Sequence, residues 1–172
     1  MVIDVDIFKA ILERRSVRHY LPKPVEEEKI IKILEACRWA PSARNLQPWE
    51  LIVIRDRELL KKLAETAPYG RFIAEAPIAI AVVTDPSSRW HIVDGSLLTQ
   101  NLMLAAWALG LGTCWIGSMD REKAKEILGI PKEKHLLTII PIGYPAKVKE
   151  SHRKPLREFV YLNHYGVRYF TD

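Results

Sequence analysis

The feature that most constrains this chain is a long helical segment with almost no charged side chains in its second half. The motif Asp85-Pro86-Ser87 opens the segment, Gly110 closes it, and residues 96–107 read SLLTQNLMLAAW. A helix that is apolar on nearly every face lies in the centre of a core or packs against another chain. The fold must therefore either surround this helix or build an oligomer on it.

Shorter helices and strands alternate on both sides of this segment. Helical spacing and cap residues predict helices over residues 7–14, 25–38, 57–66, 72–75 and 121–128, with Asp6, Asp56 and Asp120 as N-caps. Short apolar runs predict strands over residues 49–55, 78–84, 113–116 and 136–142. No repeat or low-complexity linker interrupts the pattern, so we expect a single domain over residues 1–172.

Both ends of the chain carry apolar side chains that need a place to pack. In the first predicted helix, Ile7 and Ile11 are expected to face inward, with Phe8 and Leu12 beside them. The last segment holds four aromatic side chains, Tyr161, Tyr165, Tyr169 and Phe170. These are too many for a free tail, so we expect this segment to dock on its own subunit or on another.

Composition is that of a globular protein and excludes several classes. Hydrophobic residues make up 48% of the 172 positions and charged residues 27%, which argues against disorder. No apolar run approaches the roughly 20 residues of a membrane helix, and the amino terminus lacks the apolar core of a signal peptide. The two cysteines, Cys37 and Cys114, are too few for a disulfide framework, so we expect a cytoplasmic protein without a membrane partner.

The formal net charge of +5 permits a nucleic-acid partner but does not require one. Most lysines and arginines alternate with glutamates on predicted helices, which is the pattern of a solvated face. The exceptions are two short clusters, residues 14–18 and 152–154. Because no basic helix face or stacking-aromatic motif accompanies this charge, we expect no nucleic-acid binding.

Motifs for several common chemistries are missing. The chain has no Gly-x-Gly-x-x-Gly fingerprint, no phosphate-binding Gly-x-x-x-x-Gly-Lys loop, no His-Glu-x-x-His and no Gly-x-Ser-x-Gly elbow. Its five histidines show no metal-ligand spacing. Hydrolase and metalloenzyme interpretations therefore lose most of their support, and we expect no metal site.

Three segments could instead hold a ligand. Arg14-Arg15-Ser16-Val17-Arg18 places fork-shaped donors that suit phosphate oxygens, although cations also favour the end of a helix. Residues 40–49 set Ser, Arg, Asn and Gln between two prolines, which suits the edge of a flat heterocycle or an ordinary connection. Residues 110–118 flank a short strand with glycines, which lets backbone approach a ligand closely.

Together these segments resemble the nitroreductase family of FMN-dependent oxidoreductases. The order is Arg-Arg-Ser-x-Arg, Pro-Ser-x-x-Asn-x-Gln-Pro-Trp, Gly-x-Gly-Thr-x-Trp-Ile-Gly and a late Arg153-Lys154-Pro155, from about residue 8 to residue 165. The resemblance implies an α+β fold of three layers, with a central, mainly antiparallel sheet flanked by helices. It also implies an intertwined homodimer with FMN at the interface, in which residues 97–107 form the interface helix.

The resemblance assigns roles by position. Arg14, Arg15 and Ser16 match phosphate and ribityl contacts, and Arg18 matches a cation beside the flavin pyrimidine edge. Asn45 matches an amide at the ring edge, while Pro41, Ser42 and Gln47 match contacts to the partner's flavin. Ile116 and Gly117 match backbone near flavin N5, and a late phosphate ligand falls on Arg153 or Lys154.

The implied activity is a ping-pong reaction: NADH or NADPH gives a hydride to flavin N5, and a small nitroaromatic or quinone acceptor then takes the electrons. No protein acid or base is required, because the cofactor does the chemistry. A flavin-binding carrier or sensor, and a flavin-cleaving or dehalogenating member of the family, stay open as alternatives. Few residues separate Ala67 from Pro77, so only Tyr69, Arg71 and Phe72 are available as a lip over the site.

Overall fold

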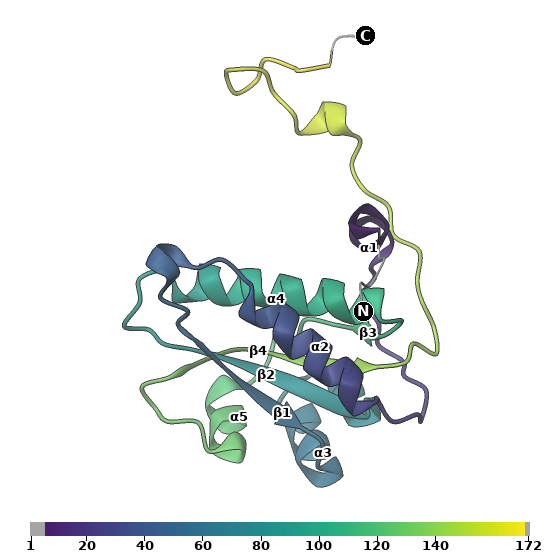
Figure 1. The fold of residues 1–172 in the computed structure, drawn as a ribbon, viewed down its shortest axis with the longest axis vertical. Coiled ribbons are helices and arrows are strands. Elements are labelled where there is room, and N and C mark those ends of the chain that lie inside the picture. The colour runs from purple at the N-terminus through teal and green to yellow at the C-terminus, as the bar shows by residue number, and fades with distance from the viewer. Residues whose placement is uncertain (1–5, 171–172) are drawn as a thin grey trace.

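The computed structural model describes residues 6–170, and its centre is a four-stranded sheet in the order β1-β2-β4-β3 (Figure 1). The strands are β1 (Trp49–Ile54), β2 (Ile78–Thr84), β3 (Gly112–Thr113) and β4 (His135–Gly143). The α-helices are α1 (Ile7–Glu13), α2 (Glu27–Arg38), α3 (Arg57–Glu65), α4 (His91–Ala108) and α5 (Arg121–Leu128). Three 3-10 turns complete the set: η1 (Ala43–Asn45), η2 (Arg71–Glu75) and η3 (Leu156–Glu158).

Every strand pair in the sheet is antiparallel, and alternate residues of each strand face opposite layers. On β2, Ile78, Ile80 and Val82 pack in one cluster with α2 and α4, whereas Ala79, Ala81 and Val83 pack in a second cluster with α3 and α5. Both faces of β2 are thus buried. The result is the predicted α+β fold of three layers, with α2 and α4 on one face of the sheet and α3 and α5 on the other.

The long apolar helix α4 is buried on one side only. Leu98, Leu102 and Ala106 lie in the core, while Ile92 and Leu97 are exposed. Between α1, α2 and α4 lies an apolar hollow of about 320 Å³, lined by Ile7, Ala10, Lys32, Ala36, Asn101, Leu104, Ala105, Ala108 and Leu109. Within one chain, α4 is therefore part core helix and part uncovered surface.

The prediction for the inner face of α1 is wrong for a single chain. Asp6 caps the helix as expected, with its carboxylate accepting from the Phe8 and Lys9 N–H groups at 2.9 and 3.2 Å. Of the helical residues only Ala10 is buried, and Ile7, Phe8, Ile11 and Leu12 are all exposed. The reason is that α1 touches the carboxyl end of α4 and reaches no second layer.

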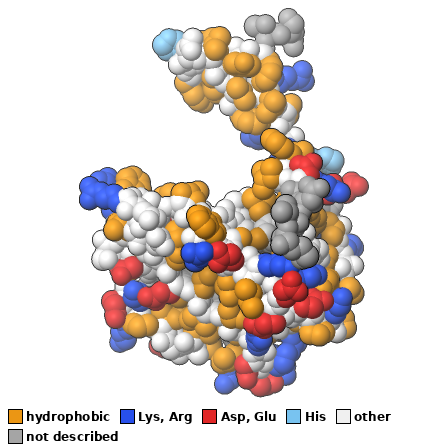
Figure 2. Space-filling model, viewed as in Figure 1, with side chains coloured by type: hydrophobic (Ala, Val, Ile, Leu, Met, Phe, Trp, Pro, Cys, Tyr) orange, Lys and Arg blue, Asp and Glu red, His pale blue; other side chains and the backbone are white. Residues whose placement is uncertain are grey.

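The aromatic tail extends away from the body (Figure 1). Tyr161 and Arg168 pair across a short bridge, and the Arg168 guanidinium donates to the carbonyls of Arg157 and Glu158 at 2.8 Å each. Figure 2 shows hydrophobic side chains covering this arm. They are Leu156, Phe159, Leu162, Tyr165, Val167, Tyr169 and Phe170, all exposed. The arm is folded on itself but does not dock on its own subunit.

Some element bounds differ from those predicted. The long helix begins at His91 rather than directly after Asp85-Pro86-Ser87, because residues 86–90 form turns. The strand predicted over residues 113–116 is confined to Gly112–Thr113, since only these two residues pair with β4. Within residues 6–170 no helix has both the length and the apolarity needed to cross a bilayer.

A close backbone contact joins the first arginine cluster to the sheet. Ser16 bridges Thr113 in parallel, and the Val17 N–H donates to the Thr113 carbonyl at 2.8 Å. This seam leaves no room at Gly112, because a Cβ there would lie 2.5–2.9 Å from the Val17 side chain. Val17 is fully buried, so it has no open space to move into.

We therefore expect Gly112→Ala to destabilise the protein by roughly 1–3 kcal/mol through overpacking at this seam. Gly117→Ala is a matched control, since a Cβ at Gly117 would meet nothing closer than 3.9 Å. Urea unfolding of both variants measures the difference. Equal stabilities would show that the seam is not tightly packed.

Candidate active site

The two basic clusters of the sequence meet in one hollow. Residues 14–18 run from the end of α1 along β3, and residues 149–153 pass beside them. The hollow measures about 260 Å³ and is lined by Arg14, Arg15, Ser16, Arg18, Lys149, Glu150, Ser151 and Arg153. Five cations and one carboxylate thus face a shared space formed by segments more than a hundred residues apart in the sequence.

This arrangement of like charges is unfavourable without an anion. The pKa of Arg14 is lowered from its ordinary value, first by partial burial and then by the positive charges of Arg153 and Arg15. Burial and neighbouring cations both disfavour the charged form of a guanidinium. A bound phosphate would not undo the burial, but its negative charge and its hydrogen bonds would favour the charged guanidinium and so counteract the lowering of the pKa. We name this hollow the arginine pocket.

Arg15 also agrees with the alternative interpretation of the cluster, in which cations stabilise the end of a helix. Its guanidinium donates to the carbonyls of Leu12 and Arg14 at 2.7 and 2.9 Å, which satisfies the carboxyl end of α1. Arg153 is held by the Ser151 hydroxyl and by the His152 carbonyl. Both side chains are therefore fixed in place by the chain itself rather than left to find a position on binding.

A second hollow of about 150 Å³ shares Arg18 with the arginine pocket. Its other lining residues are Tyr69, Phe72, Cys114, Trp115, Ile116, Gly117 and Ser118. The described residues give no reason for glycine at position 117, since a Cβ there would meet nothing closer than the Trp115 ring at 3.9 Å and the backbone is not left-handed. A flat ligand lying against the backbone of residues 116–117 would supply that reason.

The Cys114 thiol in this hollow is not activated. Burial raises its pKa above the ordinary value, and this effect outweighs the lowering by Arg18. A thiol with a raised pKa is a poor nucleophile near neutral pH. The hollow therefore offers shape and charge but no reactive cysteine.

The third predicted segment lies elsewhere in the chain. Residues 41–47 sit beside the amino end of α4, where Asp94 contacts Ala43, whereas α1 and β3 lie beside the carboxyl end (Figure 1). From Asp94 to Ala108 the helix rises about 20 Å. Pro41, Ser42, Asn45 and Gln47 are thus together, but one chain does not bring them to the arginine pocket.

The backbone of this loop is strained. Arg44, Asn45 and Gln47 have φ angles of 54°, 56° and 50°, in the left-handed region that residues other than glycine seldom adopt. Such conformations persist only where the surroundings hold them, and they gather at functional sites. The strain favours the ligand-binding interpretation of residues 40–49 over an ordinary connection.

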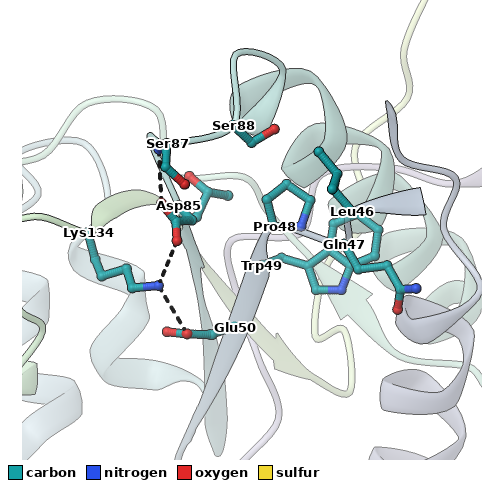
Figure 3. A pocket seen from close by; sticks show the side chains of 10 residues that line it. Leu46, Gln47, Pro48, Trp49, Glu50, Asp85, Ser87, Ser88 and Lys134 are labelled. Atoms are coloured by element: carbon teal, nitrogen blue, oxygen red, sulfur yellow. Dashed lines mark hydrogen bonds and ion pairs between the residues drawn. The ribbon is translucent and has the colours of Figure 1, made fainter. Parts of the chain in front are cut away.

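Beside this loop lies a hollow of about 300 Å³ that lacks the charge for an anion (Figure 3). Lys134 bridges Glu50 and Asp85, with Nζ to carboxylate oxygen distances of 3.2 Å each. Hydrogen bonds from Ser87 and Lys134 lower the pKa of Asp85 to about 2, so the Asp85 carboxylate is ionised at neutral pH. The lysine is therefore neutralised, and the arginine pocket remains the better candidate.

Comparison with known proteins agrees with this geometry. The sequence profile of the nitroreductase family matches residues 11–67 and 65–144. The chain belongs to the nitroreductase family. This finding confirms the family predicted from the sequence, together with the layered fold described above.

Individual relatives support the same conclusion. A protein of Archaeoglobus fulgidus, provisionally named an NADH dehydrogenase/NAD(P)H nitroreductase, is 40% identical over 86% of this chain and 90% of its own length. An FMN reductase [NAD(P)H] of Bacillus subtilis is 29% identical over 92% of this chain and 73% of its own. The solved structure of an FMN-dependent nitroreductase from Clostridium difficile R20291 covers 92% of this chain and 99% of its own, at 32% identity and a TM-score of 0.86.

These relatives confirm the predicted oxidoreductase class, and their names agree with the predicted FMN and NAD(P)H. The structure brings Arg14, Arg15, Ser16, Arg18 and Arg153 into one pocket and places Ile116 and Gly117 in the adjoining hollow. Lys154 does not line either space. Sequence reasoning missed Lys149 and Ser151, whose only signal was their position just before the late basic cluster.

We expect inorganic phosphate to stabilise the protein once it is freed of small molecules. At ten times the dissociation constant the gain is about 1.4 kcal/mol, or roughly 3–5 °C in Tm for a chain of this size. Thermal unfolding with phosphate is compared with chloride at equal ionic strength. The Arg14→Gln variant should lose most of the rise in Tm that phosphate causes, and the Arg55→Gln variant should keep it. Equal rises in both variants would exclude the arginine pocket as the phosphate site.

Proposed function

We propose that this protein is an FMN-dependent NAD(P)H oxidoreductase that reduces small nitroaromatic or quinone-type acceptors. The observation that supports it most is the arginine pocket, which opens through Arg18 into the hollow beside Ile116 and Gly117. A phosphate site joined to a space for a flat ring matches the two ends of FMN. Residues 1–172 would form one FMN-binding domain.

The residues of one chain fit the phosphate end and one side of the ring. Arg14, Arg15, Ser16 and Arg153 would hold the phosphate, with Lys149 and Ser151 as further donors. The backbone of Ile116 and Gly117 would lie against the ring. Arg18 lines both spaces, so its charge would favour the negatively charged, reduced form of the ring and raise its potential.

The chemistry that FMN supplies when bound is hydride uptake from NAD(P)H followed by electron delivery to the acceptor, in ping-pong order. The residues of the chain would bind the FMN and orient the nucleotide and the acceptor beside it. Tyr69 and Phe72 of the predicted lip line the hollow, and Tyr69 is 84% exposed, so its side chain does not cover the site as a lid. A site without this cover would suit NADH or NADPH and a range of planar acceptors.

The second half of the site would come from a partner subunit. None of residues 41–47 lines the arginine pocket or the adjoining hollow, and α4 rises about 20 Å between Asp94, which bonds this loop, and Ala108 beside α1. Their side chains would therefore reach a flavin across a dimer interface. The uncovered apolar hollow along α4 and the hydrophobic arm are surfaces that a second copy would bury. We therefore propose an intertwined homodimer. The free thiols of Cys37 and Cys114 suit the reducing cytoplasm.

Arg14→Ala tests the phosphate assignment. Loss of a charge-assisted contact of roughly 1.5–3 kcal/mol should weaken FMN binding about 10–100-fold. Flavin fluorescence titration of the FMN-free protein measures the affinity. Arg55→Ala is the matched control, since Arg55 pairs with Glu27 on the surface and lines neither hollow. Equal affinities in the two variants would refute the assignment.

Mixed dimers test the shared site. A chain with Arg14→Ala and a chain with both Asn45→Ala and Gln47→Ala should each bind FMN weakly alone. Refolded together, half of the dimers carry one intact site, which restores about a quarter of the wild-type number of tight sites. If each site were built from one chain, mixing would restore none.

Reduction itself is tested anaerobically. NADH or NADPH should bleach the absorbance of the FMN-loaded protein, and a nitroaromatic or quinone should restore it. A bound flavin that neither nucleotide bleaches would instead identify a carrier or sensor. A bleached flavin that no acceptor of the panel reoxidises would contradict the proposed acceptor class.

A further inference from the structure

One buried carboxylate has no role in the site described so far. Asp94 lies in the first turn of α4 and is 2% exposed. Its Oδ1 accepts a hydrogen bond from the Ala43 N–H at 3.1 Å, and its Oδ2 has no hydrogen-bond partner among the residues that the structure describes. Burying a carboxylate oxygen without a hydrogen-bond partner costs free energy. We therefore expect Asp94 to have a role in the protein that compensates for this cost.

Asp94 is also the link between the strained loop and the body of the protein. The other hydrogen bonds of residues 41–47 are local. They include those from the Asn45 N–H to the Ser42 carbonyl, from the Gln47 N–H to the Ser42 hydroxyl at 3.0 Å, and from the Gln47 amide to the Asn45 side chain at 3.1 Å. Within residues 6–170, the Asp94 bond to Ala43 is the only hydrogen bond from residues 41–47 to a distant element.

The position of Asp94 suits this task. It stands on the helix that forms the rigid side of the core, and its negative charge lies at the positive end of the α4 dipole. The bond fixes Ala43 directly before Arg44 and Asn45, the first two left-handed residues of the loop. A charge-assisted bond at that point holds the turn in a conformation that the free chain would seldom adopt.

We propose that Asp94 is a positioning residue that sets the loop of residues 41–47 for the partner subunit's flavin. This inference rests on the proposed function, in which that loop completes the partner's site. It has a specific consequence. Asp94 should act in trans: its loss should damage the site that contains the partner's arginine pocket and spare the pocket of its own chain.

Three variants test the hydrogen bond. Asp94→Ala removes the acceptor and should weaken FMN binding of the homodimer about tenfold. Asp94→Asn keeps an amide oxygen for the Ala43 N–H and should stay within about threefold of wild type. Asp56→Ala removes a comparable bond, from Asp56 Oδ1 to the Leu59 N–H at 2.8 Å at the start of α3. It should lower Tm without changing FMN affinity.

Measurements of Tm distinguish a positioning role of Asp94 from a general structural role. Asp94→Ala also removes a buried oxygen without a partner, which offsets the lost bond, so we expect its Tm to change less than that of Asp56→Ala. A fall in FMN affinity with little change in Tm supports the proposal. A large fall in Tm with unchanged affinity of the folded fraction overturns it, as does an Asp94→Asn variant as weak as Asp94→Ala.

Mixed dimers decide between action in trans and action in cis. A chain with Asp94→Ala refolded with a chain carrying Arg14→Ala should regain about a quarter of the tight FMN sites. If Asp94 served the pocket of its own chain, both pockets would be defective and no tight site would return. The pair of Arg14→Ala with Asn45→Ala/Gln47→Ala is the reference. If the reference pair fails, the shared site itself is wrong; if only the Asp94 pair fails, this inference is wrong.

Discussion

The candidate site depends on one unfavourable arrangement that the fold enforces, the gathering of like charges in the arginine pocket. Arg14 is partly buried beside Arg15 and within the field of Arg153, which lowers its pKa. The fold imposes this closeness through backbone contacts: Val17 is bonded to Thr113, and β3 is bonded to β4. The well-packed sheet and its two helix layers supply the stability that holds these cations together. An anion bound there would relieve the repulsion, and in the proposed function that anion is the phosphate group of FMN.

The length of α4 supports the proposal that a second chain completes the site. Asp94, near the amino end of the helix, bonds the strained loop, and the helix rises about 20 Å from there to Ala108, which lies beside α1. None of residues 41–47 lines the arginine pocket or the adjoining hollow, so in the proposed function this loop would serve the partner subunit. The side of α4 that faces away from the core is apolar, as is the arm of residues 156–170. The same helix that separates the two halves of the site thus offers the surface on which a second copy would reunite them.

Sequence patterns predicted most of the layered fold because the buried residues of its strands and helices recur at the regular spacing of each element. The alternation of Ile80 with Ala79 and Ala81 on β2, and the helical spacing on α2, come directly from local sequence. The prediction for the inner face of α1 failed because, within residues 6–170, its apolar side chains stay exposed rather than packing into a second layer. The choice between Arg153 and Lys154 also needed the structure, because neighbouring residues of an irregular segment point in different directions. The left-handed conformation of Arg44, Asn45 and Gln47 was not predictable from the sequence, because none of these residues is glycine and the bond from Ala43 to Asp94 joins residues 51 positions apart. A signal for Asp94 did exist: it is the single acidic residue of α4.

Two glycines of the candidate site show how a requirement of the fold differs from a requirement of a ligand. At Gly112 a Cβ would overlap Val17, so the chain's own packing demands glycine whether or not anything is bound. At Gly117 a Cβ would meet only the Trp115 ring, at an ordinary van der Waals distance of 3.9 Å, and nothing within the described residues demands its absence. The two positions lie on the same short segment, five residues apart, yet only the first is explained by the subunit alone. In the proposed function, the flavin ring lying against the backbone of residues 116–117 would explain the second, and Arg18, which borders both spaces, would join that ring site to the arginine pocket.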